Sequence, residues 1–245
     1  RKSYVVVAAL ALRDFRAGSA ADVVKSLMLE LEAWDRGPSQ GMESISQISA
    51  AHGVLESYLK RHQELKFDVS ETFRNFQPKE GSDTQVGGAN PYAIDQDLDW
   101  SGLKHLLRGR RSLRSFDASR LPTPEVLHSI ARTAIKSPSV CNRQTGRLHV
   151  FTGEKVKQLL EYQTGNRGFG HQVPILFVVT SDMRFFLSRK ERKQPGIDGG
   201  LFALQTVLAI QSEGMGSVCL NWCVDHNSDL KLREIAGIPE HENVI

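Results

Sequence analysis

Cysteine is scarce in this 245-residue chain, which has only Cys141, Cys219 and Cys223. Three cysteines are too few for a disulfide scaffold, and an odd number is typical of a reducing compartment, so we expect a cytoplasmic protein. The pair Cys219 and Cys223, with His226 nearby, lacks the second ligand pair found at zinc-finger spacing. The sequence therefore predicts no metal site.

Long apolar runs are also missing. The opening stretch RKSYVVVAALAL has two basic residues before an apolar run, but that run extends only from Tyr4 to Leu12. Spanning a bilayer takes roughly 20 residues. The polar stretch RDFRAGSA follows directly, which favours an N-terminal helix over an export signal. We expect no membrane span.

The chain has little excess of charge of either sign, with a formal net charge of +3. This is too small for a general nucleic-acid binder, and no recognition motif is present. Against this background, Arg108–Phe116 reads RGRRSLRSF and concentrates four arginines in nine residues. Such a local concentration favours a small anionic ligand, with a solvated surface turn as the alternative.

The first part of the chain has helical patterning. Apolar residues recur at three- and four-residue steps within residues 20–36 and more weakly within residues 44–65. A stretch rich in Gly, Pro, Asp, Asn and Gln follows, as is typical of a linker. We predict a helical N-terminal region over residues 1–77 and a linker or surface arm over residues 78–99.

From Trp100 the pattern alternates between helices and strands, which predicts a further region over residues 100–245. Helices are expected from a cap at Ser101, after Thr123 and Pro124, and over residues 153–165, 198–213 and 227–236. Strands are expected over residues 147–152, 173–180 and 242–245, and at 217–223 before a loop. The helix over 198–213 is apolar on nearly all faces, which predicts a place in a core or a subunit interface.

Four segments of this region carry groups suited to a ligand. RRSLR at residues 110–114 places guanidinium groups and a hydroxyl close together, and these can hold a phosphate. SPSVCNRQ at 137–144 and QTGN at 163–166 display hydroxyl and amide groups, and GMGSVCLNW at 214–222 is a glycine turn ending in an amide. Taken singly, each segment also fits a plain surface turn or the end of a helix.

Together, the order and spacing of these segments resemble the FMN-dependent nitroreductase family. The resemblance covers about three fifths of the chain, from Trp100 to Ile245, and its sharpest motifs are RRSLRSF, PSVCNRQ and DGGLFALQTVLAIQSEGMGSVCLNW. It implies an α+β, nitroreductase-like fold, with a central mixed or antiparallel sheet flanked by helices. Here an α-helical N-terminal extension precedes that fold.

The resemblance also implies contacts to FMN. Arg110 and Ser112 match positions that bind the phosphate and the ribityl chain, and Arg111 would contribute mainly through its backbone. Arg114 matches the basic residue beside N1 and O2 of the ring, where a fixed cation stabilises the negative charge of the reduced flavin. Asn166 matches an amide that reads the pyrimidine edge.

In this family FMN lies at the interface of a homodimer, so one loop would reach the flavin bound by a second subunit. The apolar helix over residues 198–213 would then lie at a two-fold interface. The remaining matching positions are Pro138, Ser139, Val140, Asn142 and, more weakly, Gln144 on that loop, with Leu220 and Asn221 along the ring near N5.

The implied function is an oxidoreductase in which NADH or NADPH reduces bound FMN by hydride transfer. An electron-poor acceptor, such as a nitroaromatic or a quinone, is then reduced over the same ring face. One alternative is a flavin-binding sensor or scaffold with little turnover, linked to polysaccharide biosynthesis. Another is chemistry on oxygen or halogenated aromatics, with MRFFLSRKERKQPG as part of a substrate lid. The basic residues of that segment fit either an anionic ligand or a solvated loop.

Two features depart from the family pattern. The family has further basic phosphate contacts after a strand like ENVI, so we expect the C-terminal end of the domain to be missing from this sequence. The first hundred residues have no counterpart in the minimal family fold.

Overall fold

The computed structural model describes residues 2–12, 14–35, 42–74, 76 and 99–245. The chain divides into two units, 1–96 and 97–245, which are described separately. The predicted arm at residues 78–99 lies outside the described residues except for Asp99.

The described part of the N-terminal unit contains three helices, which confirms the predicted helical region. They are α1 (Lys2–Leu10), α2 (Ala21–Asp35) and α3 (Met42–Glu64). Their apolar faces and a following turn form one core, as their periodicity predicts. Its buried members are Val6, Val24, Leu27, Met28, Leu31, Ala51, Val54, Leu55, Tyr58 and Phe73.

A buried histidine joins α3 to the turn that precedes α2. The Nε2 atom of His62 accepts a hydrogen bond of 2.9 Å from the Gly18 N–H. Because Nε2 accepts, the proton lies on Nδ1, which donates to the Tyr58 carbonyl at 2.8 Å. Gly18 has a φ of +76°, a conformation that favours glycine. The fully buried ring thus satisfies two backbone groups and fixes the turn.

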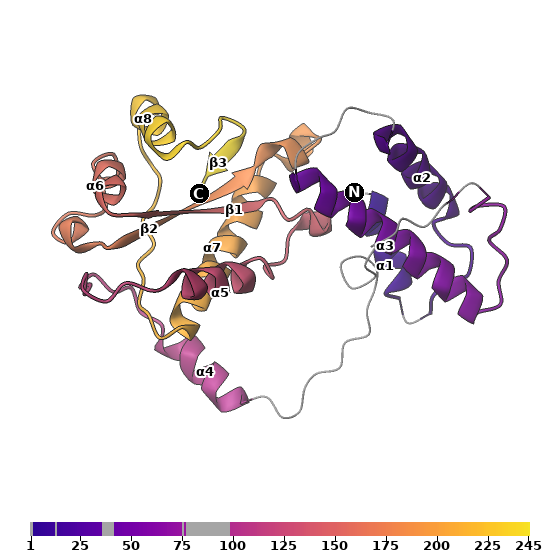
Figure 1. The fold of residues 1–245 in the computed structure, drawn as a ribbon, viewed down its shortest axis with the longest axis horizontal. Coiled ribbons are helices and arrows are strands. Elements are labelled where there is room, and N and C mark those ends of the chain that lie inside the picture. The colour runs from indigo at the N-terminus through magenta and orange to yellow at the C-terminus, as the bar shows by residue number, and fades with distance from the viewer. Residues whose placement is uncertain (1, 13, 36–41, 75, 77–98) are drawn as a thin grey trace. The chain divides into compact units, whose positions relative to one another are not determined.

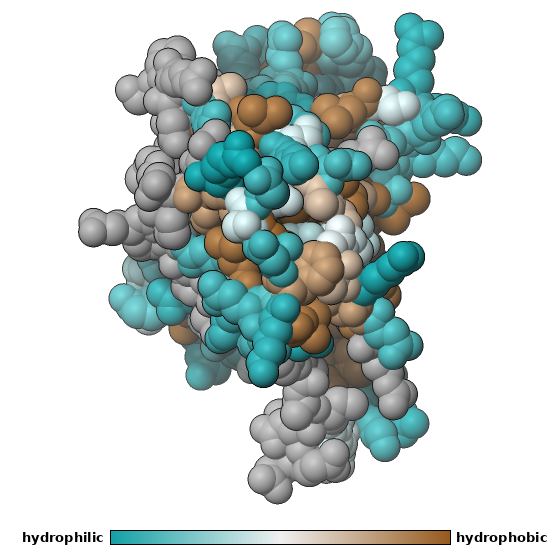
Figure 2. Space-filling view, turned by 90° about the vertical axis from the view of Figure 1, so that its right-hand side faces the viewer, coloured by the Kyte–Doolittle hydropathy of each residue, from teal (hydrophilic) through white to brown (hydrophobic). Residues whose placement is uncertain are grey.

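Some large apolar side chains of this unit stay exposed, among them Leu12, Leu29 and Phe67. Figure 2 shows apolar groups lying between hydrophilic ones on the face that it draws. Isolated apolar side chains are ordinary on protein surfaces. Across the described residues of both units, no helix is long and apolar enough to span a membrane.

The C-terminal unit is built on a small antiparallel sheet. Its strands are β1 (Gly146–Thr152), β2 (Ile175–Asp182) and β3 (Glu242–Val244), in the order β1-β2-β3. The register pairs Gly146 with Ser181 and Thr152 with Ile175. On the other side of β2, Asp182 pairs with Glu242.

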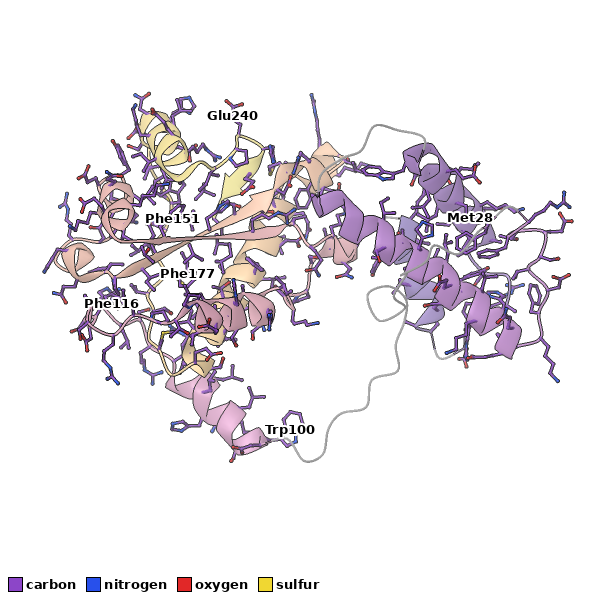
Figure 3. The ribbon with its side chains drawn as sticks, in the orientation of Figure 1. Met28, Trp100, Phe116, Phe151, Phe177 and Glu240 are labelled. Carbon is purple, nitrogen blue, oxygen red and sulfur yellow. The ribbon has the colours of Figure 1, made fainter. Side chains whose placement is uncertain are left out.

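Helices cover both faces of this sheet (Figure 1). They are α5 (Pro124–Ala134), α6 (Glu154–Leu160), α7 (Gln194–Ser212) and α8 (His226–Ala236). The helix α4 (Trp100–Gly109) packs against α7 and not against the sheet. Phe177 packs with α5 and α7 on one face, and Phe151 packs with α6 and α8 on the other (Figure 3). This arrangement confirms the predicted α+β fold.

Two local predictions were wrong. The N-cap of α4 is Asp99, not Ser101, because the Asp99 carboxylate accepts from the Gly102 N–H at 2.9 Å. The Ser101 hydroxyl donates to that same carboxylate at 2.7 Å. The stretch 217–223 is not a strand: it forms one isolated parallel bridge, from Ser217 to Ser112.

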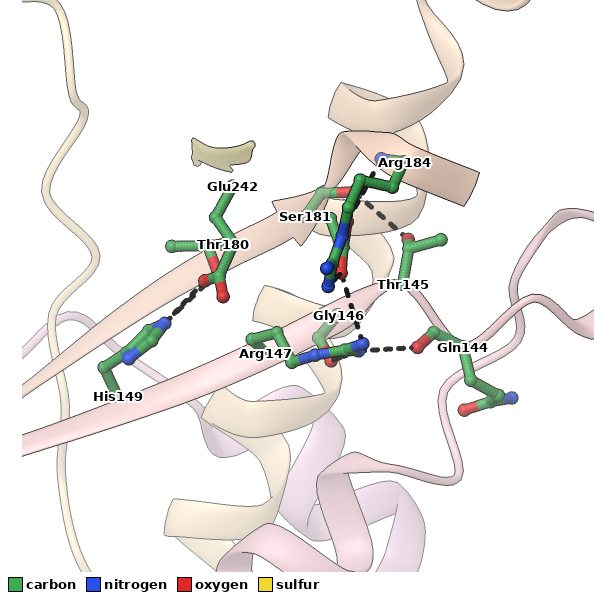
Figure 4. A network of polar contacts seen from close by, with 10 residues as sticks. Gln144, Thr145, Gly146, Arg147, His149, Thr180, Ser181, Arg184 and Glu242 are labelled. Atoms are coloured by element: carbon green, nitrogen blue, oxygen red, sulfur yellow. Dashed lines mark hydrogen bonds and ion pairs between the residues drawn. The ribbon is translucent and has the colours of Figure 1, made fainter. Parts of the chain in front are cut away.

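Polar groups hold the β1-β2-β3 register at one end of the sheet (Figure 4). The Asp182 carboxylate is fully buried and accepts from Arg184 Nη2 at 2.6 Å, with Arg147 Nη2 at 3.5 Å. Glu242 accepts from His149 Nε2 at 2.7 Å and from the Thr180 hydroxyl. These contacts satisfy two buried carboxylates on neighbouring strands.

The pKa of Asp182 lies below its ordinary value. Burial alone would raise this pKa, but hydrogen bonds from the Arg184 side chain and N–H, with the charges of Arg184 and Arg147, outweigh burial. The charged Asp182 carboxylate therefore contributes its full stabilisation of the folded state at pH values above the ordinary aspartate pKa, about 3.9. This contribution is lost as the pH falls below that value and through the lower pKa of Asp182 in the folded state.

Asp182→Asn should lower the free energy of unfolding at pH 7 by about 2 to 4 kcal/mol, because two guanidinium groups lose their buried counter-charge. Denaturant titration between pH 3 and 7 measures this loss, which should shrink toward the acid end. Glu234→Gln, which breaks an exposed pair with Lys231, serves as the control and should leave stability unchanged. A loss that is equal at all pH values would contradict the assignment.

Candidate functional site

The arginine strip, residues 108–114, leaves the end of α4 and runs beside the chain that follows α7. The helix α4 ends at Arg110, whose N–H donates a hydrogen bond of 3.2 Å to the Leu106 carbonyl. The strip then turns into an extended path, and the Leu113 N–H donates to the Ser217 carbonyl at 3.0 Å. Two segments that are a hundred residues apart in the sequence therefore lie side by side.

Two glycines allow this close approach. Gly214 has a φ of +74°, which ends α7 and turns the chain toward the strip. A Cβ atom at Gly216 would lie 2.1 Å from Leu113 Cδ1, so no other residue fits there without displacing Leu113. The glycine turn is thus required by packing as well as by backbone conformation.

The arginines of the strip differ in what their side chains contact. Arg111 Nη1 donates to the carbonyls of Arg108 and Arg110 at 2.7 and 2.8 Å. Its side chain therefore holds the end of α4. In the described part of the chain, Arg108, Arg110 and Arg114 have no ion pair. The strip therefore presents uncompensated positive charge.

Arg114 lies over an aromatic ring at the edge of a cavity. Its guanidinium carbon is 6.0 Å from the centroid of the buried Phe169 ring. The cavity has a volume of about 730 Å³ and extends between β2, α7 and residues 213–222. Leu113, Phe116 and Leu220 contribute apolar walls, and Gln163 is among its few polar members. The Arg114 guanidinium thus lies next to the Phe169 ring, which lines the apolar cavity.

Gln163 joins two of the segments that the sequence singles out. Its Nε2 donates to the Asn221 carbonyl at 2.9 Å, and its Oε1 accepts from the Gly165 N–H at 2.6 Å. Asn166 donates through Nδ2 to the Leu160 carbonyl at 2.7 Å. The amide donors of Asn166 therefore close the end of α6, and its Oδ1 lies against Gly170.

The fourth segment, the loop 137–144, has an unusual backbone. Cys141, Asn142 and Gln144 have φ values of 51°, 50° and 54°, although none is glycine. Such residues cost free energy and persist only where the surroundings fix them. Within the loop, the Ser139 hydroxyl accepts from the Gln144 N–H at 2.9 Å.

Two buried side chains anchor this loop, Asp198 from α7 and Arg143 from the loop itself. Both carboxylate oxygens of Asp198, near the start of α7, lie 3.2 Å from the Val140 N–H nitrogen. Asp198 also accepts from Gln194 Nε2 at 2.8 Å. Arg143 donates to the Phe185 carbonyl at 2.9 Å and to Glu191 at 2.7 Å, and this pairing raises the pKa of Arg143.

The structure brings three of the four segments together and leaves the fourth apart. Each of these three has a member that lines the cavity beside the C-terminal part of α7: Leu113, Gln163 and Leu220. The predicted contact residues Arg110, Ser112, Arg114, Asn166 and Asn221 are not among its lining residues. The loop 137–144 does not line that cavity, and its anchor Asp198 lies in the N-terminal part of α7. At 1.5 Å per residue, the 19 residues of α7 span about 28 Å. One chain therefore does not bring all four segments to one point.

Sequence reasoning missed Gln163, Asp198 and the pair Arg143–Glu191. An acidic residue opening the apolar stretch DGGLFALQTVLAI was a usable signal for Asp198, because a carboxylate beside so apolar a run needs donors. Gln163 and Arg143 carry no comparable signal, since their contacts join residues far apart in the sequence.

Asp198→Ala should speed amide hydrogen exchange across residues 138–144 about tenfold, because the Val140 N–H loses its buried acceptor. Asp198→Asn keeps an acceptor oxygen and should restore most of the protection. Exchange measured by mass spectrometry, with α8 as the internal reference, tests this. Equal exchange in the wild type and Asp198→Ala would show that Asp198 does not hold the loop.

A family model described as "Nitroreductase family" matches residues 107–166, which include the strip and the loop. Nitroreductase CinD from Lactococcus lactis, solved with nicotinic acid, has a similar fold: 16% identity, 58% of this chain and 85% of that chain covered, and a TM-score of 0.51. A protein from Desulfovibrio desulfuricans described as a nitroreductase, in complex with FMN, gives 18% identity, 58% and 80% coverage, and a TM-score of 0.50. The comparison with curated proteins finds no match.

The sequence match and the shared fold concern the same part of the molecule. The C-terminal unit, residues 97–245, is thus similar to the nitroreductase family, in sequence over residues 107–166 and in its fold.

Proposed function

We propose that the C-terminal unit binds FMN and acts as an oxidoreductase. The observation that carries the proposal is the strip of arginines without ion pairs beside an apolar cavity. FMN combines a dianionic phosphate with a planar ring system, and it needs both kinds of surface. The match of residues 107–166 to the nitroreductase family model and the FMN complex of the Desulfovibrio desulfuricans protein support this choice.

Arg110 and Ser112 would hold the phosphate and the ribityl chain. Both residues are in the extended strip, and Ser112 is bridged to Ser217, which directly follows Gly216. A guanidinium fork and a hydroxyl can together give several charge-assisted hydrogen bonds to a phosphate. The backbone path fixed by Ser217 would set their spacing.

Arg114 would lie beside the reducible ring. Its contact with Phe169 fixes the guanidinium without neutralising it, so the charge remains available to the ligand. When bound, FMN supplies hydride chemistry, accepting two electrons from NADH or NADPH and passing them to an acceptor such as a nitroaromatic or a quinone. Leu220 and Asn221, held by Gln163, would orient the ring and limit the access of water.

The loop 138–144 would complete the site of a second copy of the chain. Ile197, Leu201 and Leu204 form a stripe on α7 that is 52%, 40% and 53% exposed. An antiparallel pairing of two α7 helices along this stripe would bury it. It would also bring the N-terminal end of one α7, with its loop, toward the C-terminal end of the other, with its arginine strip.

Arg110→Ala should weaken FMN binding about tenfold to a hundredfold, because a charge-assisted contact to the phosphate is lost. Arg114→Ala should mainly slow the reduction of bound flavin by NADH or NADPH. Equilibrium dialysis and anaerobic stopped-flow absorbance measure the two effects. Arg132→Ala, an exposed arginine on α5, is the control.

Wild-type FMN affinity and reduction rate in both variants would contradict this site. Flavin that binds tightly but is reduced slowly in the wild type by both nucleotides would instead favour a sensor or scaffold.

Leu201→Glu should convert the protein to a monomer and lower its FMN content, because a carboxylate would enter the apolar α7 pairing. Analytical ultracentrifugation and flavin absorbance measure both changes. Leu230→Glu, on the exposed side of α8, is the matched control and should change neither. A wild-type protein that is monomeric and binds a full equivalent of FMN would refute the shared site.

A further inference from the structure

The segment just before α7 is rich in exposed basic residues. Between the turn Met183–Phe185 and the start of α7, the chain reads FLSRKERK. Its exposed cations have no ion pair within the described residues. These residues are Arg189, Lys190, Arg192 and Lys193.

Two other exposed lysines of the same unit have a carboxylate partner. Lys157 lies 2.9 Å from Glu154 on α6, and Lys231 lies 2.8 Å from Glu234 on α8. Lys104, Lys136 and Lys155 are exposed and have no ion pair among the described residues. The segment 189–193 is distinguished by the concentration of four such cations within five residues.

Glu191, the one acidic residue inside the segment, forms an ion pair with a residue outside the segment. Glu191 pairs with Arg143 Nη2 at 2.7 Å, and its other oxygen accepts from the Leu187 N–H at 2.9 Å. The Arg143 side chain is only 6% exposed, so this ion pair is screened from water. Glu191 therefore holds the segment in place through Arg143 and the Leu187 N–H.

The same ion pair fixes the segment to the loop 138–144. Arg143 belongs to that loop, and it also donates to the Phe185 carbonyl and lies over the Phe186 ring. Asp198 ties the loop to the α7 helix that follows the segment. Loop and basic segment are thus joined by buried contacts at one end of α7.

We propose that Arg189, Lys190, Arg192 and Lys193 select aromatic substrates that carry a negative charge, such as a carboxylate or a sulfonate. The inference rests on the proposed function, in which the loop 138–144 borders the flavin of a second copy. The cations joined to that loop would then lie at the rim of the same site. Charge at a rim raises the local concentration of an oppositely charged ligand and orients it as it enters.

The test is a binding experiment on the full-length protein with FMN, using two unreactive probes on one ring system. Naphthalene-2-sulfonate is anionic, and naphthalene-2-methanol is neutral. Calorimetry gives both dissociation constants at low ionic strength, and the flavin absorbance shows whether each probe lies at the flavin. The triple variant Lys190→Gln, Arg192→Gln, Lys193→Gln is compared with the control Lys155→Gln, Lys157→Gln, Lys231→Gln, which removes the same charge from α6 and α8.

The triple variant should bind the sulfonate about tenfold more weakly and the neutral probe within about twofold of wild type. Salt should reduce the difference. The control should match wild type, and sulfonate binding should perturb the flavin absorbance. An unchanged sulfonate affinity, an equal loss for both probes, or sulfonate binding that leaves the flavin spectrum unchanged would overturn the inference.

FMN uptake by the wild-type protein distinguishes failure of the proposed function from failure of the substrate inference. A wild-type protein that takes up no FMN overturns both proposals, whatever the probes do. FMN uptake without discrimination between the probes overturns the substrate inference alone.

Discussion

The packing of α7 against the β1–β2 face is the constraint on which the candidate site depends. Phe202 lies against Gly146, where a Cβ atom would come within 2.6 Å of its ring, and Ile210 shares a core with Ile130 and Phe177. These contacts fix the helix on one side of the sheet. Every other element of the site is then positioned by one end of α7 or the other.

At its N-terminal end, α7 carries the loop 138–144 through Asp198. At its C-terminal end, Gln211 Nε2 donates to the Leu106 carbonyl of α4 at 3.2 Å, and Gly214 turns the chain toward the arginine strip. A rigid helix of this length keeps the two halves apart within one chain. Two copies related by a two-fold axis offer a simple way to bring them together, and for this reason the proposed flavin site and the proposed dimer are one hypothesis.

Much of the fold was predictable because its signals are local. The apolar periodicity of α2 and α3, the Thr123-Pro124 start of α5 and the apolar run of α7 each depend on residues close together in the sequence. The predicted strand at 217–223 failed because its apolar residues, among them Val218 and Leu220, line the cavity and do not pair in a ladder. The predicted N-cap of α4 was wrong because Asp99 and Ser101 are both good capping residues. The helix starts after Asp99 because the Gly102 N–H donates to the Asp99 carboxylate.

The candidate site was predictable in its segments but not in its supports. Charge and motif order identified the strip, the loop and the glycine turn, because those groups would face a ligand directly. Asp198 and Val140 are 58 residues apart, as are Gln163 and Asn221, and only the tertiary fold brings each pair into contact. Likewise, the pairing of Glu191 with Arg143 joins the basic segment to the loop, which the sequence RKERK alone cannot show.

The central claim is that each flavin site is made by two copies of the chain, and complementation between two defective variants tests it most directly. One variant carries Arg110→Ala and Arg114→Ala in the strip, and the other carries Ser139→Ala and Asn142→Ala in the loop. When the two variants are co-expressed with different tags, mixed dimers form. In a mixed dimer, one flavin site contains the substitutions of both variants, and the other site contains none of them. The account predicts that about a quarter of the wild-type FMN sites return in a randomly paired mixture. A mixture that binds no more FMN than the average of the two variants alone would contradict it.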